Sequence, residues 1–153
     1  MKRTLFFFMA LAAFFGPQSL PAAELAGKPK VIDARTLEVA GQRVRLYGID
    51  TPDAGQPCHW PAKDIDCGRI SMTALLDLVA VSQRIVCMPE KGDGFFRCFD
   101  DGSDIAENMV YTGWALPTPG DPAGYGAKAA IAEKRRHGMW RGTFEKPWEW
   151  RRR

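Results

Sequence analysis

The segment from Gln42 to Asp53 brings together residue types that could hold a phosphate beside a hard cation. Arg45 lies in a stretch that alternates apolar and polar residues as a β-strand does, so its side chain is expected to project from one face of a strand. An acidic turn with Asp50 and Asp53 follows at once. Because a guanidinium binds phosphate oxygens and carboxylates bind hard cations, this spacing indicates a site for a phosphate next to a divalent ion.

Two sequence blocks give this segment a family resemblance. Residues 43–53 read RVRLYGIDTPD, and residues 31–39 read VIDARTLEV. Together they resemble the thermonuclease, or staphylococcal-nuclease-like, family, whose blocks take the form V-x-D-G-D-T and then R-x-R-L-x-G-I-D-T/A-P-E. The second block agrees almost residue for residue. The resemblance extends over nearly the whole chain, and it is closest to an exported subgroup that carries cysteines and a PWEWRR tail.

The resemblance implies a calcium-dependent phosphodiesterase that cleaves nucleic acid. In the family, two aspartates and a backbone carbonyl hold one calcium ion, two arginines grip the phosphate, and a glutamate positions or activates the attacking water. Asp50 and the carbonyl of Thr51 fall at metal-ligand positions. Arg45 falls at a substrate-binding and catalytic arginine position, and Asp53 at the glutamate position. Aspartate is one methylene shorter, and a misplacement of about 1 Å can cost on the order of 100-fold in rate.

Two positions depart from the family pattern. Arg35 stands where the other calcium-binding aspartate is expected, and Ala34 replaces the glycine beside it. The second catalytic arginine is expected at Asp93 or Gly94, and neither is basic. Arg97 follows three or four residues later and would fill that place only after a shift of register. The calcium site is therefore degraded, and we expect nuclease activity to be weak or lost.

The exchange at Arg35 has a specific structural interpretation. We hypothesise that its guanidinium takes the place of the metal and bridges Asp50 and Asp53, since an arginine fork matches carboxylate oxygens well. The alternative is that Arg35 points to solvent from a turn. Some members of the exported subgroup are linked to succinoglycan biosynthesis. The resemblance thus leaves a second function open, a non-catalytic anion-binding accessory protein for nucleic acid or acidic exopolysaccharide.

Five short strands and three helices are expected to position these residues. The hydrophobic periodicity predicts strands over residues 31–32, 36–40, 43–47, 84–88 and 95–99, helices over residues 70–81, 105–111 and 127–137, and a loop over residues 50–66. Asp104 is predicted to cap the second helix. This order fits a small β-barrel with packed helices, an α+β fold, and the resemblance implies a five-stranded OB-type barrel.

The C-terminal segment, residues 140–153, is rich in tryptophan and arginine. We expect Trp140, Trp148 and Trp150 to bury their rings against the barrel or the third helix, because large aromatic side chains mostly bury area. The alternative is that these rings stack on a ligand.

Four cysteines remain for disulfide chemistry: Cys58, Cys67, Cys87 and Cys98. An even count in an exported chain favours two disulfides. Of the three possible pairings we favour the local one, Cys58 with Cys67 and Cys87 with Cys98, because each pair lies across one turn. Neither pair has the ligand spacing of a zinc site, so zinc is not expected.

The chain begins with the composition of a secretory signal peptide. Lys2 and Arg3 precede an apolar run over residues 5–15, and the small residues Ala22 and Ala23 follow. We predict a signal peptide over residues 1–23, one domain over residues 24–153, and a periplasmic or secreted protein without a transmembrane segment after cleavage. The alternative is an uncleaved anchor, but a membrane span needs about 20 apolar residues.

Charge is spread unevenly along the predicted mature chain. Residues 24–127 hold 10 Lys/Arg against 15 Asp/Glu, whereas residues 128–153 hold 9 against 3. A basic C-terminal part suits a polyanion, but a near-neutral whole does not drive strong non-specific binding to nucleic acid. We therefore expect weak binding of nucleic acid or binding of an acidic polysaccharide. We also expect the protein to be a monomer.

Overall fold

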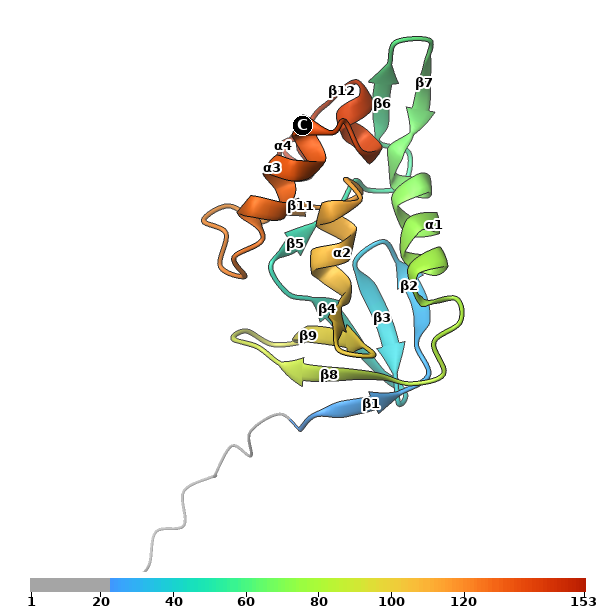
Figure 1. The fold of residues 1–153 in the computed structure, drawn as a ribbon, viewed down its shortest axis with the longest axis vertical. Coiled ribbons are helices and arrows are strands. Elements are labelled where there is room, and N and C mark those ends of the chain that lie inside the picture. The colour runs from blue at the N-terminus through green and yellow to red at the C-terminus, as the bar shows by residue number, and fades with distance from the viewer. Residues whose placement is uncertain (1–22) are drawn as a thin grey trace, which may run out of the picture.

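The protein is organised around one main sheet of seven strands. A computed structural model describes residues 23–153, which form an α+β fold with four α-helices and a multi-stranded sheet (Figure 1). The main sheet has the order β1-β8-β9-β4-β3-β2, with β10 paired to β9. Its strands are β1 (Leu25–Gly27), β2 (Lys30–Asp33), β3 (Thr36–Val39), β4 (Gln42–Leu46), β8 (Ile85–Pro89), β9 (Phe95–Asp100) and β10 (Ser103–Asp104). The β4–β9 pair is parallel, and its neighbours in the sheet are antiparallel.

The β3–β4 hairpin fixes which side chains reach the core. Its two-residue connection, Ala40–Gly41, has positive φ at both residues (50° and 78°), as a turn that matches the twist of a hairpin requires. In the resulting register Thr36 lies opposite Arg45. Val44 and Leu46 are buried and Arg45 is exposed, so the predicted alternation of β4 is confirmed.

Two smaller sheets carry the remaining strands. One joins β5 (Ile49–Asp50) to β11 (Leu116–Pro117), and the other has the order β12 (Thr143–Phe144), β6 (Pro57–Trp60), β7 (Lys63–Asp66). Figure 1 shows the β6–β7 hairpin and the C-terminal elements at one end of the long axis, and β1, β8 and β9 at the other. The acidic turn that follows β5 leads directly into the β6–β7 hairpin.

Side-chain caps set the starts of the first two helices. Asp66 accepts a hydrogen bond from the backbone N–H of Arg69 (2.9 Å) at the start of α1 (Cys67–Val79). Asp104 accepts one from the N–H of Glu107 (3.1 Å) at the start of α2 (Ile105–Tyr111), which confirms the predicted cap. The other helices are α3 (Gly126–Lys134), the 3-10 helix η1 (Gly138–Arg141) and α4 (Pro147–Trp150).

Three predicted segments need correction. Residues 50–66, predicted as a loop, contain β6 and β7, whose pairing is supported by β12 from the distant C-terminal segment. The helix predicted from residue 70 begins at Cys67, because the Asp66 cap lies ahead of the apolar stripe. The helix predicted to residue 137 ends at Lys134, because the chain turns at Arg136, where φ is 54°.

Two hydrophobic clusters stabilise this arrangement. The main cluster lies between the sheet and α1 and α2, and includes Leu37, Leu46 and Met109. The second contains Cys58, Cys67, Leu116 and Met139, with Trp140 and Trp148 packed against it. Trp140 and Trp148 are thus partly buried, but against this second cluster rather than on the main sheet as predicted. Trp150 belongs to neither cluster, and the Arg153 guanidinium lies 4.9 Å from the centre of its ring.

Two disulfides tie neighbouring elements together. Cys58–Cys67 joins β6 to the start of α1, with Cα atoms 5.6 Å apart. Cys87–Cys98 joins β8 to β9 at directly opposite positions in the register, with Cα atoms 4.0 Å apart. The predicted local pairing is confirmed.

The predicted signal peptide falls almost wholly on residues 1–22, which lie outside the described part of the chain. Within residues 23–153, no helix combines the length and the apolar character that crossing a bilayer requires.

Candidate functional site

Local backbone contacts hold the acidic turn in place. Asp50 ends β5, where its partner Leu116 on β11 fixes the strand. The next residues form a turn in which the N–H of Gln56 donates to the carbonyl of Asp53 (2.9 Å). The start of α1 packs so closely here that a Cβ atom on Gly68 would lie 1.9 Å from the Asp53 carbonyl oxygen. Only glycine allows this approach of helix and turn.

Arg35 reaches this turn from the β2–β3 connection. Its backbone N–H donates to the carboxylate of Asp33 (2.9 Å), which shapes the connection. Its Nη1 atom lies 3.0 Å from Asp50 Oδ1, 3.1 Å from Asp53 Oδ1 and 3.1 Å from the Thr51 carbonyl oxygen. One guanidinium nitrogen therefore contacts both carboxylates and the carbonyl. The hypothesis that Arg35 bridges the two acids is confirmed, and the solvent-pointing alternative is wrong, since its side chain is only 20% exposed.

A second arginine, not predicted from the sequence, completes the site. Arg151 follows α4 and donates from Nη1 to Asp53 Oδ2 (3.1 Å) and from Nη2 to Asp50 Oδ2. All four carboxylate oxygens of the pair thus face a guanidinium. Burial opposes the charged form of Arg151, but hydrogen bonds to the two carboxylates outweigh that cost and raise the pKa of the guanidinium above its ordinary value. We call this group of two arginines and two aspartates the Arg–Asp quartet.

The donor set does not fit a calcium ion. Calcium is bound by six to eight oxygen atoms at about 2.3–2.6 Å. Here the oxygens at the family's metal position already accept hydrogen bonds from a fixed cation, so an ion placed among them would lie against the Arg35 guanidinium. Within residues 23–153, no group of three or more His, Cys, Asp and Glu side chains is arranged to hold a metal.

Arg45 lies apart from the quartet in its contacts. It is exposed on β4, and its guanidinium carbon lies 5.0 Å from the centre of the Phe95 ring. In the described part of the chain no carboxylate forms an ion pair with it. Its positive charge is therefore open to an anion from outside the protein.

Arg97 does not replace the missing second arginine. It lies opposite Met88 in the β8–β9 register, and Asp93 and Gly94 remain in the connecting turn. Its Nε lies 3.2 Å from Glu90 Oε1 and its Nη1 3.6 Å from Asp104 Oδ2. These ion pairs hold Arg97 within the fold, so the register shift that would make it a phosphate ligand has not occurred.

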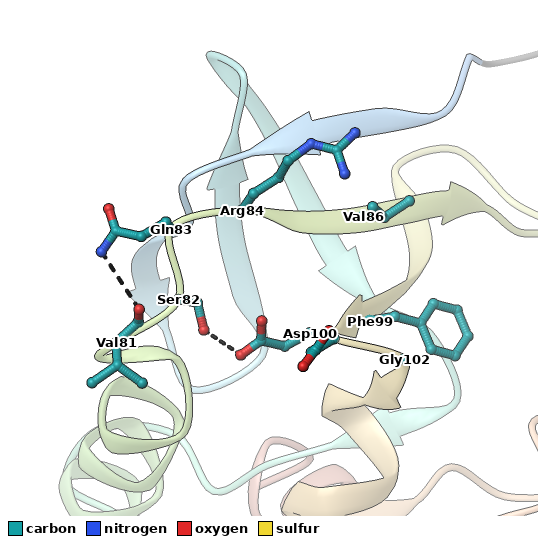
Figure 2. A pocket seen from close by; sticks show the side chains of 9 residues that line it. Val81, Ser82, Gln83, Arg84, Val86, Phe99, Asp100 and Gly102 are labelled. Atoms are coloured by element: carbon teal, nitrogen blue, oxygen red, sulfur yellow. Dashed lines mark hydrogen bonds between the residues drawn. The ribbon is translucent and has the colours of Figure 1, made fainter.

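Two cavities of the protein differ in whether residues of the candidate site line them. One of about 280 Å³ borders the quartet and is lined by residues that include Arg35, Asp53, Gly68 and Arg69. A larger one, about 660 Å³, lies beyond the end of α1, where Figure 2 shows Ser82 hydrogen-bonded to Asp100. The larger cavity holds none of the predicted site residues.

Comparison with known proteins identifies two relatives of this chain. The chain is 32% identical to the succinoglycan biosynthesis protein ExoI of Rhizobium meliloti (strain 1021) over 143 residues, covering 88% of this chain and 75% of that protein. It is 34% identical over 136 residues to the probable staphylococcal-like nuclease CAN1 of Oryza sativa subsp. japonica. That match covers 83% of this chain but only 38% of the rice protein.

The chain belongs to the thermonuclease, or staphylococcal-nuclease-like, family, to which its sequence blocks pointed. No family model matches the sequence.

Proposed function

We propose that this protein is an exported member of the thermonuclease family in which calcium-dependent phosphodiesterase activity is weak or lost, and that it serves as an anion-binding accessory protein. The observation that carries the proposal is the position of Arg35 Nη1, within 3.1 Å of oxygens from Asp50, Thr51 and Asp53. A guanidinium there supplies positive charge, but it cannot generate a metal-bound nucleophile as a divalent ion does.

The contacts of Asp53 support the loss of the catalytic role that the family resemblance implies for it. Arg35 and Arg151 each hold one oxygen of its carboxylate. A general base must be free to accept a proton from the attacking water. Arg45 is the residue of the family site that we propose keeps its role, as a contact for an external phosphate or carboxylate.

The name of the rhizobial relative supports a ligand class. That protein is described as acting in succinoglycan biosynthesis. We propose that the ligand of this protein is an acidic exopolysaccharide, with nucleic acid as the ancestral ligand. Two disulfides favour an oxidising compartment, so we propose that the protein acts in the periplasm or outside the cell. We also propose that it acts as a monomer.

The fold part of the proposal is a five-stranded barrel of the OB type. The five predicted strands correspond to β2, β3, β4, β9 and β8, which are consecutive neighbours in the main sheet. Gly27 of β1, at one edge of the sheet, approaches β3 near the other edge, since a Cβ atom there would lie 3.8 Å from a side-chain carbon of Val39. This approach supports a strongly curled sheet.

A calcium titration and a nuclease assay test the loss of activity. Isothermal titration of the purified protein with calcium is expected to show no binding at micromolar concentrations. Incubation with single-stranded DNA in calcium buffer is expected to give no more cleavage than the same reaction with EGTA. Robust hydrolysis that EGTA abolishes would overturn the proposal.

A further inference from the structure

The C-terminal half carries a cluster of arginines that the Arg–Asp quartet does not use. We propose that the surface formed by Lys134, Arg135, Arg136 and Arg141, here called the α3–η1 basic surface, binds an acidic polysaccharide through its carboxylate groups. This inference rests on the proposed function, because it assigns a surface to the ligand proposed above.

Charge pairing distinguishes these four residues from four of the five other cations of residues 128–153. The exception is Arg152, which is unpaired in the described part of the chain and follows α4. Lys128, Lys146, Arg151 and Arg153 each have a carboxylate partner within the protein. The four residues of the α3–η1 basic surface are exposed and form no ion pair within residues 23–153. Glu133 is the carboxylate nearest to them in sequence. A group of unpaired cations on one short segment attracts a polyanion.

The arginines of this surface make a few contacts within the protein that leave most of their hydrogen-bond donors free. Arg135 Nη1 lies 3.2 Å from the Tyr111 hydroxyl, and Arg136 Nη2 lies 3.4 Å from the Arg141 carbonyl. The guanidinium of Arg141 lies over the Trp60 ring, 5.1 Å from its centre. Since a guanidinium carries five N–H donors, most of the donors stay available for carboxylate oxygens.

The backbone at Arg136 points to a role for its side chain. The N–H of His137 donates to the Ala132 carbonyl and the N–H of Arg136 to that of Glu133, the two bonds that close a helix in the Schellman motif. The residue at this left-handed position is usually glycine, but here Arg136 adopts φ 54°. Arginine at a position that favours glycine has a conformational cost, so a function of the guanidinium would explain it.

Two shallow cavities flank η1. One of about 390 Å³ is lined partly by Arg136, Trp140 and Lys146. The other, about 310 Å³, is lined partly by Tyr111, His137 and Arg141. Volumes of this size fall at the lower end of the range of ligand pockets, about 300–1,000 Å³. Side chains of both signs line the first of these cavities and offer polar contacts to successive sugar units.

The aromatic rings favour polysaccharide over single-stranded nucleic acid. Proteins bind single strands by stacking bases on open aromatic faces. Here Arg141 lies over Trp60, Lys128 lies over Tyr111, and Trp140 meets Phe144 edge to face with ring centres 5.0 Å apart. The surface therefore offers guanidinium donors, which pair with carboxylates or phosphates, but few open platforms on which bases could stack, and it is this lack of platforms that disfavours single-stranded nucleic acid.

Arg136→Gly is the decisive variant, because it removes a charge and also relieves the backbone. Binding of polygalacturonate oligomers, a carboxylate-bearing probe, is measured by isothermal titration at low salt, with neutral dextran and a dT20 oligonucleotide as comparison ligands. We expect wild-type protein to bind polygalacturonate in preference to both. Arg136→Gly is expected to bind it roughly tenfold more weakly. Its Tm is expected to be unchanged or higher, since glycine suits this position.

Arg84→Gln is the matched control. Arg84 is exposed without an ion partner in the described part of the chain, and Figure 2 shows it beside the cavity beyond α1. It immediately precedes β8, which lies at the opposite end of the long axis from the C-terminal elements (Figure 1). This variant is expected to bind as wild type does. The inference is overturned if Arg136→Gly binds unchanged, if Arg84→Gln loses as much, or if dT20 binds more tightly than polygalacturonate. Absence of any polyanion binding would overturn both this inference and the anion-binding part of the proposed function, whereas the loss of nuclease activity is tested separately by the calcium titration and the nuclease assay.

Discussion

Arg151 and Asp50 are 101 positions apart in the sequence, and their side chains form an ion pair over the acidic turn. With the Arg35–Asp50 pair, this contact gives the turn two arginine partners from two distant segments. The side chain of Asp50 is only 11% exposed, so its charge needs such partners. The two carboxylates of the turn are thus paired with arginines from two distant segments of the chain.

Replacing Arg35 by aspartate should create a calcium site. Arg35→Asp removes the cation from the metal position and supplies the carboxylate that the family has there. We expect calcium to bind with a dissociation constant of about 0.1–1 mM, in the range of weak extracellular sites. Combined with Asp93→Arg, it should give measurable, EGTA-sensitive cleavage of single-stranded DNA.

Arg43→Asp is the control for this change of charge. Arg43 is exposed on β4 of the main sheet and, within the described residues, makes no contact with the acidic turn. Isothermal titration measures binding and a gel assay measures cleavage. A folded double variant with neither property would refute the assigned positions.

Removing Arg151 should loosen the C-terminal segment. Arg151→Gln leaves one oxygen of each aspartate without its ionic partner. We expect the free energy of unfolding to fall by about 1 kcal/mol, more than for a fully exposed pair, because the aspartates are partly buried. Urea unfolding measures the loss. The neighbouring Arg152 has no ion pair within residues 23–153, so Arg152→Gln is expected to change stability little; equal losses in both variants would count against the pairing.

Gly68 should not tolerate a side chain. A Cβ atom there would lie 1.9 Å from the Asp53 carbonyl oxygen, which is backbone and cannot move away cheaply. We expect Gly68→Ala to lower the free energy of unfolding by about 1–3 kcal/mol, as overpacked positions do. This loss would appear despite the higher helix propensity of alanine, which favours the variant by about 1 kcal/mol in an open helix. Thermal unfolding checks it, and an unchanged Tm would mean that helix and turn are less tightly packed.

Alkaline pH should destabilise the fold through Tyr125. Burial, and then the hydrogen bond from its hydroxyl to Asp104 Oδ2 (2.7 Å), raise the pKa of Tyr125 above its ordinary value. Because the pKa is higher in the folded state, the stabilisation is complete below the unfolded pKa of about 10 and is lost as pH rises above it. Tyr125→Phe should lower stability by about 1 kcal/mol at pH 7. It should also flatten the decline in Tm between about pH 10 and 11, and an equally steep decline would refute the assignment.

Local patterns in the sequence predicted much of the fold and part of the site. The alternation of β4 and the Asp104 cap act between near neighbours, so they could be identified from sequence. The bridge from Arg35 to Asp50 and Asp53 followed from the family motif, because the residues lie within two adjacent blocks.

The parts that were missed depend on contacts between distant segments. The β6–β7 hairpin lies in a proline- and cysteine-rich stretch without clear alternation, and β12 supports it only after the chain has returned. The C-terminal segment that carries β12 also brings Arg151 to the acidic turn. Gln56 holds this segment in place, because its side-chain amide donates to the Glu145 carbonyl (2.7 Å). The run of arginines at the end of the sequence was the available signal, but nothing local indicates which of them would reach the turn.

The Arg–Asp quartet has as many positive as negative groups, and all of them belong to the polypeptide. This part of the molecule therefore carries its own counterions and draws none from the medium. The ion pairs of the quartet should therefore persist when divalent cations outside the cell become scarce or when a chelating polymer sequesters them. A relative that depends on bound calcium would lose its activity under the same conditions.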